Sequence, residues 1–238
     1  MLSSGTFTAK LIKKSKVSRD AYSFYFERSP AFQFLPGQYI KMTLNIENPD
    51  ERGNSRFFSI ASSPTEKDFM MITTRIIQSS FKKTMAELKQ GDEVSIRGPY
   101  GTFTLDETEV RPLAFLAGGI GITPFRNMSV YASHKKLKNK MTLFASYSTF
   151  QDAIFYEELK SIAQDNFKFI VTITKPDPDW KGETGRIDIE KIKKHIENPQ
   201  ESVYYIAGPE SMAQSMSEIV KSMGISENQL KIESFPGY

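Results

Sequence analysis

Hydrophobic and polar residues alternate with a period of two along much of the first half of the chain. In residues 21–27 the rings of Tyr22, Phe24 and Phe26 fall on one face and the residues between them on the other. Such alternation predicts a half-buried strand. Glycine, proline, asparagine and aspartate clusters separate it from further expected strands at 38–44, 55–61, 69–75 and 93–97 and from a short helix at 80–89. Five or six short strands with one helix predict a small antiparallel β barrel.

The second half of the chain alternates between apolar runs and segments with helical periodicity. The apolar runs predict strands near 113–117, 141–147, 167–174, 203–207 and 229–232. The segments between them predict helices near 124–134, 152–163, 189–195 and 211–223. Alternating strands and helices favour an α/β domain with a parallel sheet. An acidic segment ending in proline, 106–112, suggests the boundary, so we expect two domains, residues 1–107 and residues 112–238.

Composition narrows the class of protein. A chain of 238 residues, 39% of them hydrophobic, can bury one large core or two small ones. No apolar run approaches the ~20 residues of a transmembrane helix, and no signal peptide is recognisable, so we expect a cytoplasmic protein. The net charge is only +3, without a basic stripe interleaved with aromatics, which argues against nucleic acid. There is no cysteine and no histidine pair at metal spacing, so neither a cysteine-ligated iron–sulfur cluster nor another metal site is expected.

A glycine-rich turn, residues 118–124 (GGIGITP), follows the apolar run 113–117 and opens a predicted helix. Backbone N–H groups at such a helix start favour a phosphate. Gly119 and Gly121 match the first two glycines of the dinucleotide fingerprint, but Pro124 occupies the position of the third, so the match is partial. Proline suits the first helical turn, and we expect Thr123 to cap the helix. A turn that serves only packing is the alternative.

A second motif, residues 56–64 (RFFSIASSP), is a predicted strand that carries a cation, two aromatic rings and hydroxyl groups. Arg56 could pair with a phosphate, since a guanidinium matches its geometry. Phe58 could stack on a flat ligand, and Ser59 could hydrogen-bond a ring nitrogen. Taken alone, the segment is better explained as a half-buried strand with an exposed arginine.

Together the two motifs resemble the flavin-binding signature and the pyridine-nucleotide loop of the ferredoxin–NADP reductase superfamily. Four further pieces stand in the family's order: 36–39 (PGQY), 98–101 (GPYG), 207–210 (AGPE) and 233–238 (ESFPGY). The resemblance spans nearly the whole chain. It implies a flavin-binding barrel followed by a NAD(P)-binding domain, with the flavin between them.

The same resemblance implies a flavin cofactor, with FAD favoured over FMN. It assigns Arg56 to the phosphates, Phe58 to the isoalloxazine ring and Ser59 to the neighbourhood of the reactive nitrogen N5. Phe58 departs from the commoner tyrosine, which removes a hydroxyl hydrogen bond. Further expected flavin contacts are Phe57, Thr73, Thr74, Arg75, Ser79 and Ser80. A surface cation is the alternative for Arg75, and plain helix capping is the alternative for the two serines.

For the pyridine nucleotide, the resemblance implies contacts from both glycine-containing turns and from the end of the strand 141–147. The expected residues are Gly119, Gly121, Thr123, Pro124, Ser148, Gly208 and Pro209. No arginine occurs from residue 146 to 158, where NADP-specific relatives often carry one for the extra phosphate, so NADH is favoured over NADPH. At the chain end, Phe235 or Tyr238 would cover the flavin face. Glu233 is a candidate proton shuttle, with an ordinary surface glutamate as the alternative.

The implied function is a flavin-dependent NAD(P)H oxidoreductase. Without an iron–sulfur cluster of its own, the chain would give electrons to a separate ferredoxin, flavodoxin or oxygenase component, or to a small acceptor such as free flavin or a quinone. One alternative is a free-flavin reductase, in which the flavin is a loosely bound substrate. Another is a non-catalytic flavin-bearing electron-transfer subunit or redox sensor. A nucleotide-binding module without flavin is disfavoured by residues 56–64.

Overall fold

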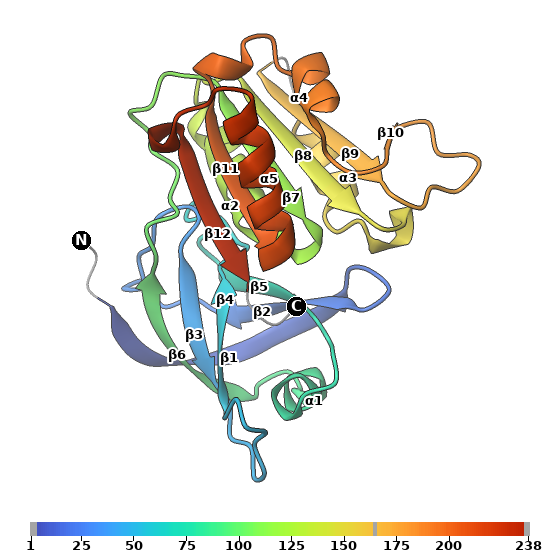
Figure 1. Ribbon diagram of the computed structural model, residues 1–238. Coiled ribbons are helices and arrows are strands. Elements are labelled where there is room, and N and C mark those ends of the chain that lie inside the picture. Colours follow the sequence, from blue (N-terminus) through green and yellow to red (C-terminus); the bar gives the residue numbers. More distant parts are fainter. Residues whose placement is uncertain (1–3, 164–165, 236–238) are drawn as a thin grey trace. The chain divides into compact units, whose positions relative to one another are not determined.

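The computed structural model describes residues 4–163 and 166–235 and divides the chain into two compact units. The first unit comprises residues 1–105 together with 126–134, and the second comprises 106–125 and 135–238 (Figure 1). In the described part of the chain, no helix combines the length and the apolar character needed to cross a membrane.

The first unit is built on a six-stranded antiparallel sheet with the strand order β4-β3-β6-β1-β2-β5, which confirms the predicted fold class. The strands are β1 (Gly5–Lys16), β2 (Ala21–Glu27), β3 (Tyr39–Thr43), β4 (Ser55–Ser59), β5 (Phe69–Arg75) and β6 (Glu93–Tyr100). The long strand β1 was absent from the sequence prediction. Its sequence does alternate at Phe7, Ala9 and Leu11, but this pattern covers only one half of the strand, and only Ala9 and Leu11 are buried.

Strands β4 and β5 are the two outer strands of this sheet, and the sheet curls so that their ends meet. The N–H of Ala61, just beyond β4, donates to the carbonyl of Met71 on β5 at 2.7 Å. Helix α1 (Ser80–Glu87) follows β5, and Ser79 caps it by accepting a hydrogen bond from the N–H of Lys82 at 3.2 Å. Phe81 of α1 is fully buried in the same hydrophobic core as the inward residues of the strands. The helix therefore belongs to the core and lies next to the residues predicted to bind flavin.

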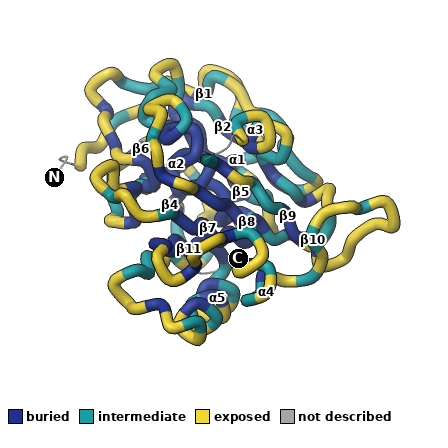
Figure 2. The backbone as a smooth tube through the Cα atoms, turned by 90° about the horizontal axis from the view of Figure 1, so that it is seen from above, coloured by how far each residue is buried: buried dark blue, intermediate teal, exposed yellow. Residues whose placement is uncertain are grey.

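The second unit contains a six-stranded sheet in the order β10-β9-β8-β7-β11-β12, and every pair is parallel, as predicted. The strands are β7 (Leu113–Gly118), β8 (Met141–Tyr147), β9 (Phe167–Ile173), β10 (Glu183–Thr184), β11 (Val203–Pro209) and β12 (Leu230–Phe235). The helices after β7 are α2 (Ile122–Lys135), most of which belongs to the first unit, α3 (Tyr156–Ser161), α4 (Ile189–His195) and α5 (Glu210–Ser222). The central strands β7 and β8 are buried along nearly their whole length, which is why they read as continuous apolar runs (Figure 2).

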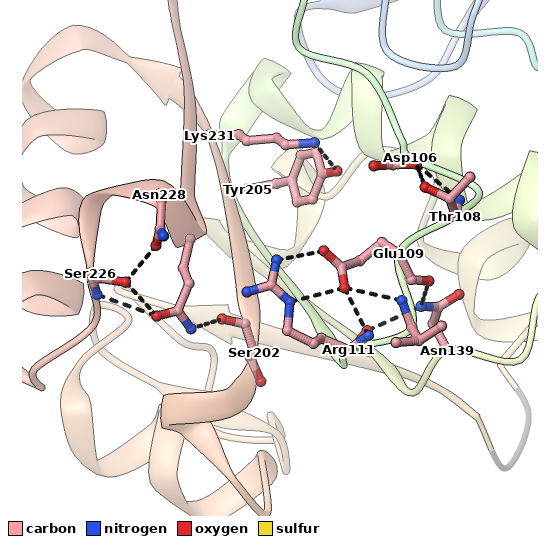
Figure 3. Close-up of polar contacts among 12 residues, drawn as sticks. Asp106, Thr108, Glu109, Arg111, Asn139, Ser202, Tyr205, Ser226, Asn228 and Lys231 are labelled. Atoms are coloured by element: carbon pink, nitrogen blue, oxygen red, sulfur yellow. Dashed lines mark hydrogen bonds and ion pairs between the residues drawn. The ribbon is translucent and has the colours of Figure 1, made fainter.

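A polar network fixes the segment that leads into β7 (Figure 3). The carboxylate of Glu109 accepts hydrogen bonds from the guanidinium of Arg111 at 2.6 and 2.9 Å. Hydrogen bonding by Arg111 lowers the pKa of Glu109 to about 2, against the opposing effect of burial. The amide of Asn139 donates to the carbonyls of both residues, at 2.6 and 3.0 Å. The acidic segment predicted as a boundary is therefore an ordered connection at the start of the parallel sheet.

Candidate functional site

Strand β4 carries Arg56 and Phe58 of the 56–64 motif on one face and Phe57 on the other. Arg56 and Phe58 point inward and are 8% and 5% exposed, whereas Phe57 points outward and is 60% exposed. This is the expected consequence of strand geometry, which sends successive side chains to opposite faces. Ser59, at the end of the strand, is also buried. The motif thus combines a buried cation and ring with a second, exposed ring.

The guanidinium of Arg56 is held by the loop that precedes β4. It donates to the backbone carbonyls of Arg52, Gly53 and Ser55 at 2.8 to 2.9 Å. It also donates to the carboxylate of Asp50 at 2.8 Å, and it lies 5.2 Å from the ring centre of Phe81. Arg56 is therefore not the exposed arginine that the motif alone left open. It is a fixed, nearly buried cation.

Asp50 places an anion at the start of helix α1. Its carboxylate accepts from Arg56 and from the N–H of Ser80 at 3.2 Å, while its own N–H donates to the Ser80 hydroxyl at 2.9 Å. Burial acts to raise the pKa of Asp50, but the hydrogen bonds from Ser80 and Arg56 and the charge of Arg56 lower it overall. A guanidinium and a helix N-terminal amide are the donors that a phosphate requires. These donor types match a flavin phosphate, and a phosphate bound here would displace the Asp50 carboxylate that now accepts from both of them.

On β5, the three residues predicted to contact flavin face different surroundings. The hydroxyls of Thr73 and Ser23 hydrogen-bond each other at 2.7 Å within the sheet. Thr74 faces helix α1 instead, and its hydroxyl oxygen accepts a hydrogen bond from the ammonium of Lys82. Arg75 lies 3.7 Å from the carboxylate of Asp20. Of the three, Thr74 is the residue whose side chain contacts helix α1, through Lys82.

Lys82 is a charged residue that the sequence analysis missed. It is 4% exposed, and its ammonium lies 4.6 Å from the ring centre of Phe58. Phe58 packs beside Phe81, with ring centres 5.9 Å apart. The stacking of Phe58 on a flavin stays a prediction, and it requires these α1 side chains to make room. Phe57, by contrast, packs edge-on against Tyr39 and Tyr100 with most of its surface exposed.

In the second unit, the glycine-rich turn connects β7 to α2 through a short 3-10 turn, Gly119–Gly121. Gly119 has a positive φ of 52°, and a Cβ on Gly121 would lie 2.2 Å from the carbonyl oxygen of Ala207. These glycines therefore serve close packing of backbones in addition to any ligand. The predicted capping role of Thr123 is wrong. The 3-10 turn starts the helix earlier, so Thr123 lies inside α2 and its hydroxyl donates to the carbonyl of Ile120 at 3.0 Å.

The carboxyl ends of four neighbouring parallel strands bring the other predicted nucleotide residues to one edge of the sheet. In the β-ladder Gly118 pairs with Ser146, and Gly208 pairs with Ser234. Pro209 pairs with Phe235, so the end of β12 reaches the same edge. Pro124, in the first turn of α2, and the exposed Ser148, just beyond β8, follow directly from these strand ends. Parallel sheets bind their ligands at this edge.

Two roles were predicted for three residues at the chain end, and the structure describes two of these residues. Glu233 and Phe235 lie on β12 and are half-buried. Tyr238 lies outside the described residues. The assignments of Phe235 as a cover for flavin and of Glu233 as a proton shuttle stay predictions.

An aromatic cluster that the sequence analysis missed follows β8. The ring of Phe150 lies 4.8 Å from that of Tyr156 and 5.3 Å from that of Trp180, and Phe150 remains 38% exposed. Just before it, the hydroxyl of Thr149 donates to the carboxylate of Asp152 at 2.8 Å in a capping box. In the sequence, the aromatic residue Phe150 shortly after the end of β8 could have indicated this cluster.

The fold combines an antiparallel β domain with a parallel α/β domain, and each carries a candidate site. Comparison with protein families agrees with this class. Residues 8–105 match an oxidoreductase FAD-binding domain, and residues 115–218 match an oxidoreductase NAD-binding domain. The chain belongs to the ferredoxin reductase-like superfamily.

Similar proteins include a component of the Na⁺-translocating NADH-quinone reductase of Haemophilus ducreyi, 30% identical over 76% of this chain and 49% of that protein. A flavohemoprotein of Oceanobacillus iheyensis is 29% identical over 95% of this chain and 58% of its own length. The chain thus spans about half the length of the curated relatives it matches. In fold, it resembles the FAD/NAD-binding domain of a Vibrio cholerae nitric oxide dioxygenase, with a TM-score of 0.85, 20% identity and coverage of 96% and 98% of the two chains.

Proposed function

We propose that this chain is the reductase part of a flavin-dependent NAD(P)H oxidoreductase, with residues 1–107 binding FAD and residues 112–238 binding the pyridine nucleotide. The observation that carries the proposal is the group of anion-binding donors beside Phe58, within the part that matches an FAD-binding domain. When bound, FAD supplies the redox chemistry, because it accepts a hydride from a reduced nicotinamide and passes the electrons onward.

The protein's own contribution is to bind and orient the two cofactors. Arg56 neutralises phosphate charge, Ser59 donates to the reactive edge of the ring, and Phe58 supplies a flat apolar surface. Gly119 and Gly121 let the backbone approach the nucleotide phosphates closely.

We propose NADH as the preferred electron donor. From residue 146 to 158 no arginine is available for a 2′-phosphate, and the hydroxyl of Thr149 already donates to Asp152. The carboxylate of Asp152 would also repel such a phosphate. The partly exposed ring of Phe150 offers a stacking surface for adenine.

We propose that the electrons leave to a separate protein carrier in the cytoplasm, either a ferredoxin-like protein or an oxygenase component. The chain has no cysteine with which to ligate an iron–sulfur cluster of its own. Two structural neighbours are described as a cytochrome P450 reductase and as the ferredoxin reductase of a carbazole dioxygenase. Their names support an acceptor of this kind.

FAD binding by purified protein tests the proposal. We expect FAD to stay with the protein through gel filtration, and Arg56→Met to weaken FAD binding at least tenfold. Arg97→Met, a change at an exposed arginine on β6, is the matched control and should bind like the wild type. Equal affinity of Arg56→Met and the wild type would contradict the proposed site. Loss of flavin on the column, together with rapid NADH oxidation when FAD is added back, would favour a free-flavin reductase.

A further inference from the structure

We propose that Lys82 is a phosphate-binding residue of the flavin site and that its amine takes up a proton when FAD binds. This inference rests on the proposed function, and it adds a residue and a pH dependence that the 56–64 motif does not contain. It starts from the position of Lys82 in the first turn of α1, where the side chain turns into the core. Lys83, the next residue, is exposed in the ordinary way.

A lysine is almost never fully buried without a specific reason, because its charged form loses hydration. The ammonium of Lys82 donates to the hydroxyl of Thr74 and lies over the Phe58 ring. Both of these residues were predicted to contact the flavin. The amine is therefore aimed at the same place as the flavin motif.

Three elements surround the amine of Lys82, and two of them present charged groups. On β4 it faces Arg56, and from the preceding loop it is influenced by Arg52, whereas β5 presents the neutral Thr74. The carboxylate in this region is Asp50, which hydrogen-bonds Arg56 and the N–H of Ser80. Three cations therefore converge with one carboxylate, so the site has excess positive charge. The pyrophosphate of FAD carries two negative charges and would balance that excess.

The protonation state of the amine follows from these surroundings. Burial, together with the positive charges of Arg56 and Arg52, lowers the pKa of Lys82 to about 7. Near neutral pH the flavin-free protein is therefore a mixture of charged and neutral forms. A phosphate within reach of the amine favours the ammonium, because an opposite charge stabilises the charged form. Binding of FAD thus draws a proton from the solvent, and affinity falls as the pH rises.

The experiment is a titration of flavin-free protein with FAD, followed by the change in flavin fluorescence, from about pH 6 to about pH 9. For the wild type, we expect the Kd to rise by up to tenfold per pH unit above about pH 7. Lys82→Met should bind more weakly at about pH 6 and should lose most of this dependence. Lys83→Met is the matched control and should follow the wild type.

Two further measurements separate this inference from its alternatives. Calorimetry in buffers of different ionisation enthalpy should show proton uptake when the wild type binds FAD near pH 8, and less uptake for Lys82→Met. Riboflavin, which lacks phosphate, should bind without this proton uptake. A wild-type Kd that is constant over the whole pH range, or equal proton uptake by Lys82→Met, would overturn the role of Lys82 while leaving FAD binding intact. No FAD binding at any pH would overturn the proposed function as well.

Discussion

Replacing Lys82 by methionine should make the flavin-free protein more stable, and by an amount that depends on pH. A pKa lowered from 10.5 to about 7 means that folding disfavours the charged amine. At about 1.4 kcal/mol per pH unit, the cost of burying the charged amine is roughly 5 kcal/mol. This full cost applies at pH values where Lys82 is protonated in both the unfolded and the folded protein. Loss of the hydrogen bond to Thr74 takes back about 1 kcal/mol. Methionine has a similar length and no charge. We therefore expect the free energy of unfolding of Lys82→Met to exceed that of the wild type by about 3 to 4 kcal/mol at about pH 6.

The sign of the pH dependence follows from the direction of the shift. Above about pH 7 the folded wild type has a neutral Lys82, whereas the unfolded chain still holds the proton up to 10.5. The unfolded state then binds more protons, so wild-type stability rises with pH relative to the variant, by about 1.4 kcal/mol per unit. The advantage of Lys82→Met should therefore be constant below about pH 7 and should nearly vanish by about pH 9 to 10.

Equilibrium unfolding in urea, followed by far-UV circular dichroism at several pH values, measures this difference. Lys83→Met, on the exposed side of the same helix, controls for the loss of a positive charge and should differ from the wild type by less than about 0.5 kcal/mol at every pH. A variant at Lys82 that is destabilised at low pH, or whose difference from the wild type does not change with pH, would refute the reasoning that Lys82 is a buried and strained cation.

Three further predictions address the remaining residues. Gly121→Ala should destabilise the protein by about 1 to 3 kcal/mol and weaken NADH binding, because the new Cβ would lie 2.2 Å from the Ala207 carbonyl oxygen. Urea unfolding and nucleotide titration measure both effects, and Gly5→Ala, whose Cβ would have no atom within 4 Å, is the control. Phe58→Ala should lower the stability by about 3 to 5 kcal/mol and should also lower the FAD affinity, whereas Phe57→Ala at the exposed position should change the stability by less than about 1 kcal/mol. Equal effects of the two variants in unfolding and FAD titrations would show that burial does not distinguish the two rings. Ser148→Arg should raise the NADPH to NADH ratio of kcat/KM by about tenfold or more, since it adds a guanidinium for the 2′-phosphate, and an unchanged ratio in steady-state assays would place the ribose elsewhere.

Most of the fold could be predicted from the sequence, because its strands follow simple patterns. The period-two alternation of 21–27 and the apolar runs of β7 and β8 each reflect one or two buried faces. Strand β1 was missed although Phe7, Ala9 and Leu11 alternate with polar residues, because the pattern covers only half of its twelve residues and the rest is held by pairing with β2 and β6. Its position depends on partners far away in the sequence.

Residues of the candidate site could be predicted where they belong to a sequence motif. They could not be predicted where only the tertiary structure brings them to the site. Arg56 and Gly121 stand in recognisable patterns. Asp50 lies in a polar loop, and Lys82 is one of two adjacent lysines in a short helix, so neither stands out in the sequence. Only the folded structure shows that Lys82 turns inward while Lys83 remains in solvent. The start of α2 was misplaced for a similar reason, because the 3-10 turn over Gly119–Gly121 has no clear sequence signal.

The measurement that tests the proposed function most directly is an anaerobic titration of FAD-loaded protein with NADH and, separately, with NADPH, followed by the flavin absorbance. We expect prompt bleaching of the flavin by NADH and slower bleaching by NADPH. Retention of the oxidised flavin spectrum with both nucleotides, in protein that dithionite does reduce, would contradict a reductase and point to a flavin-bearing electron-transfer protein or sensor.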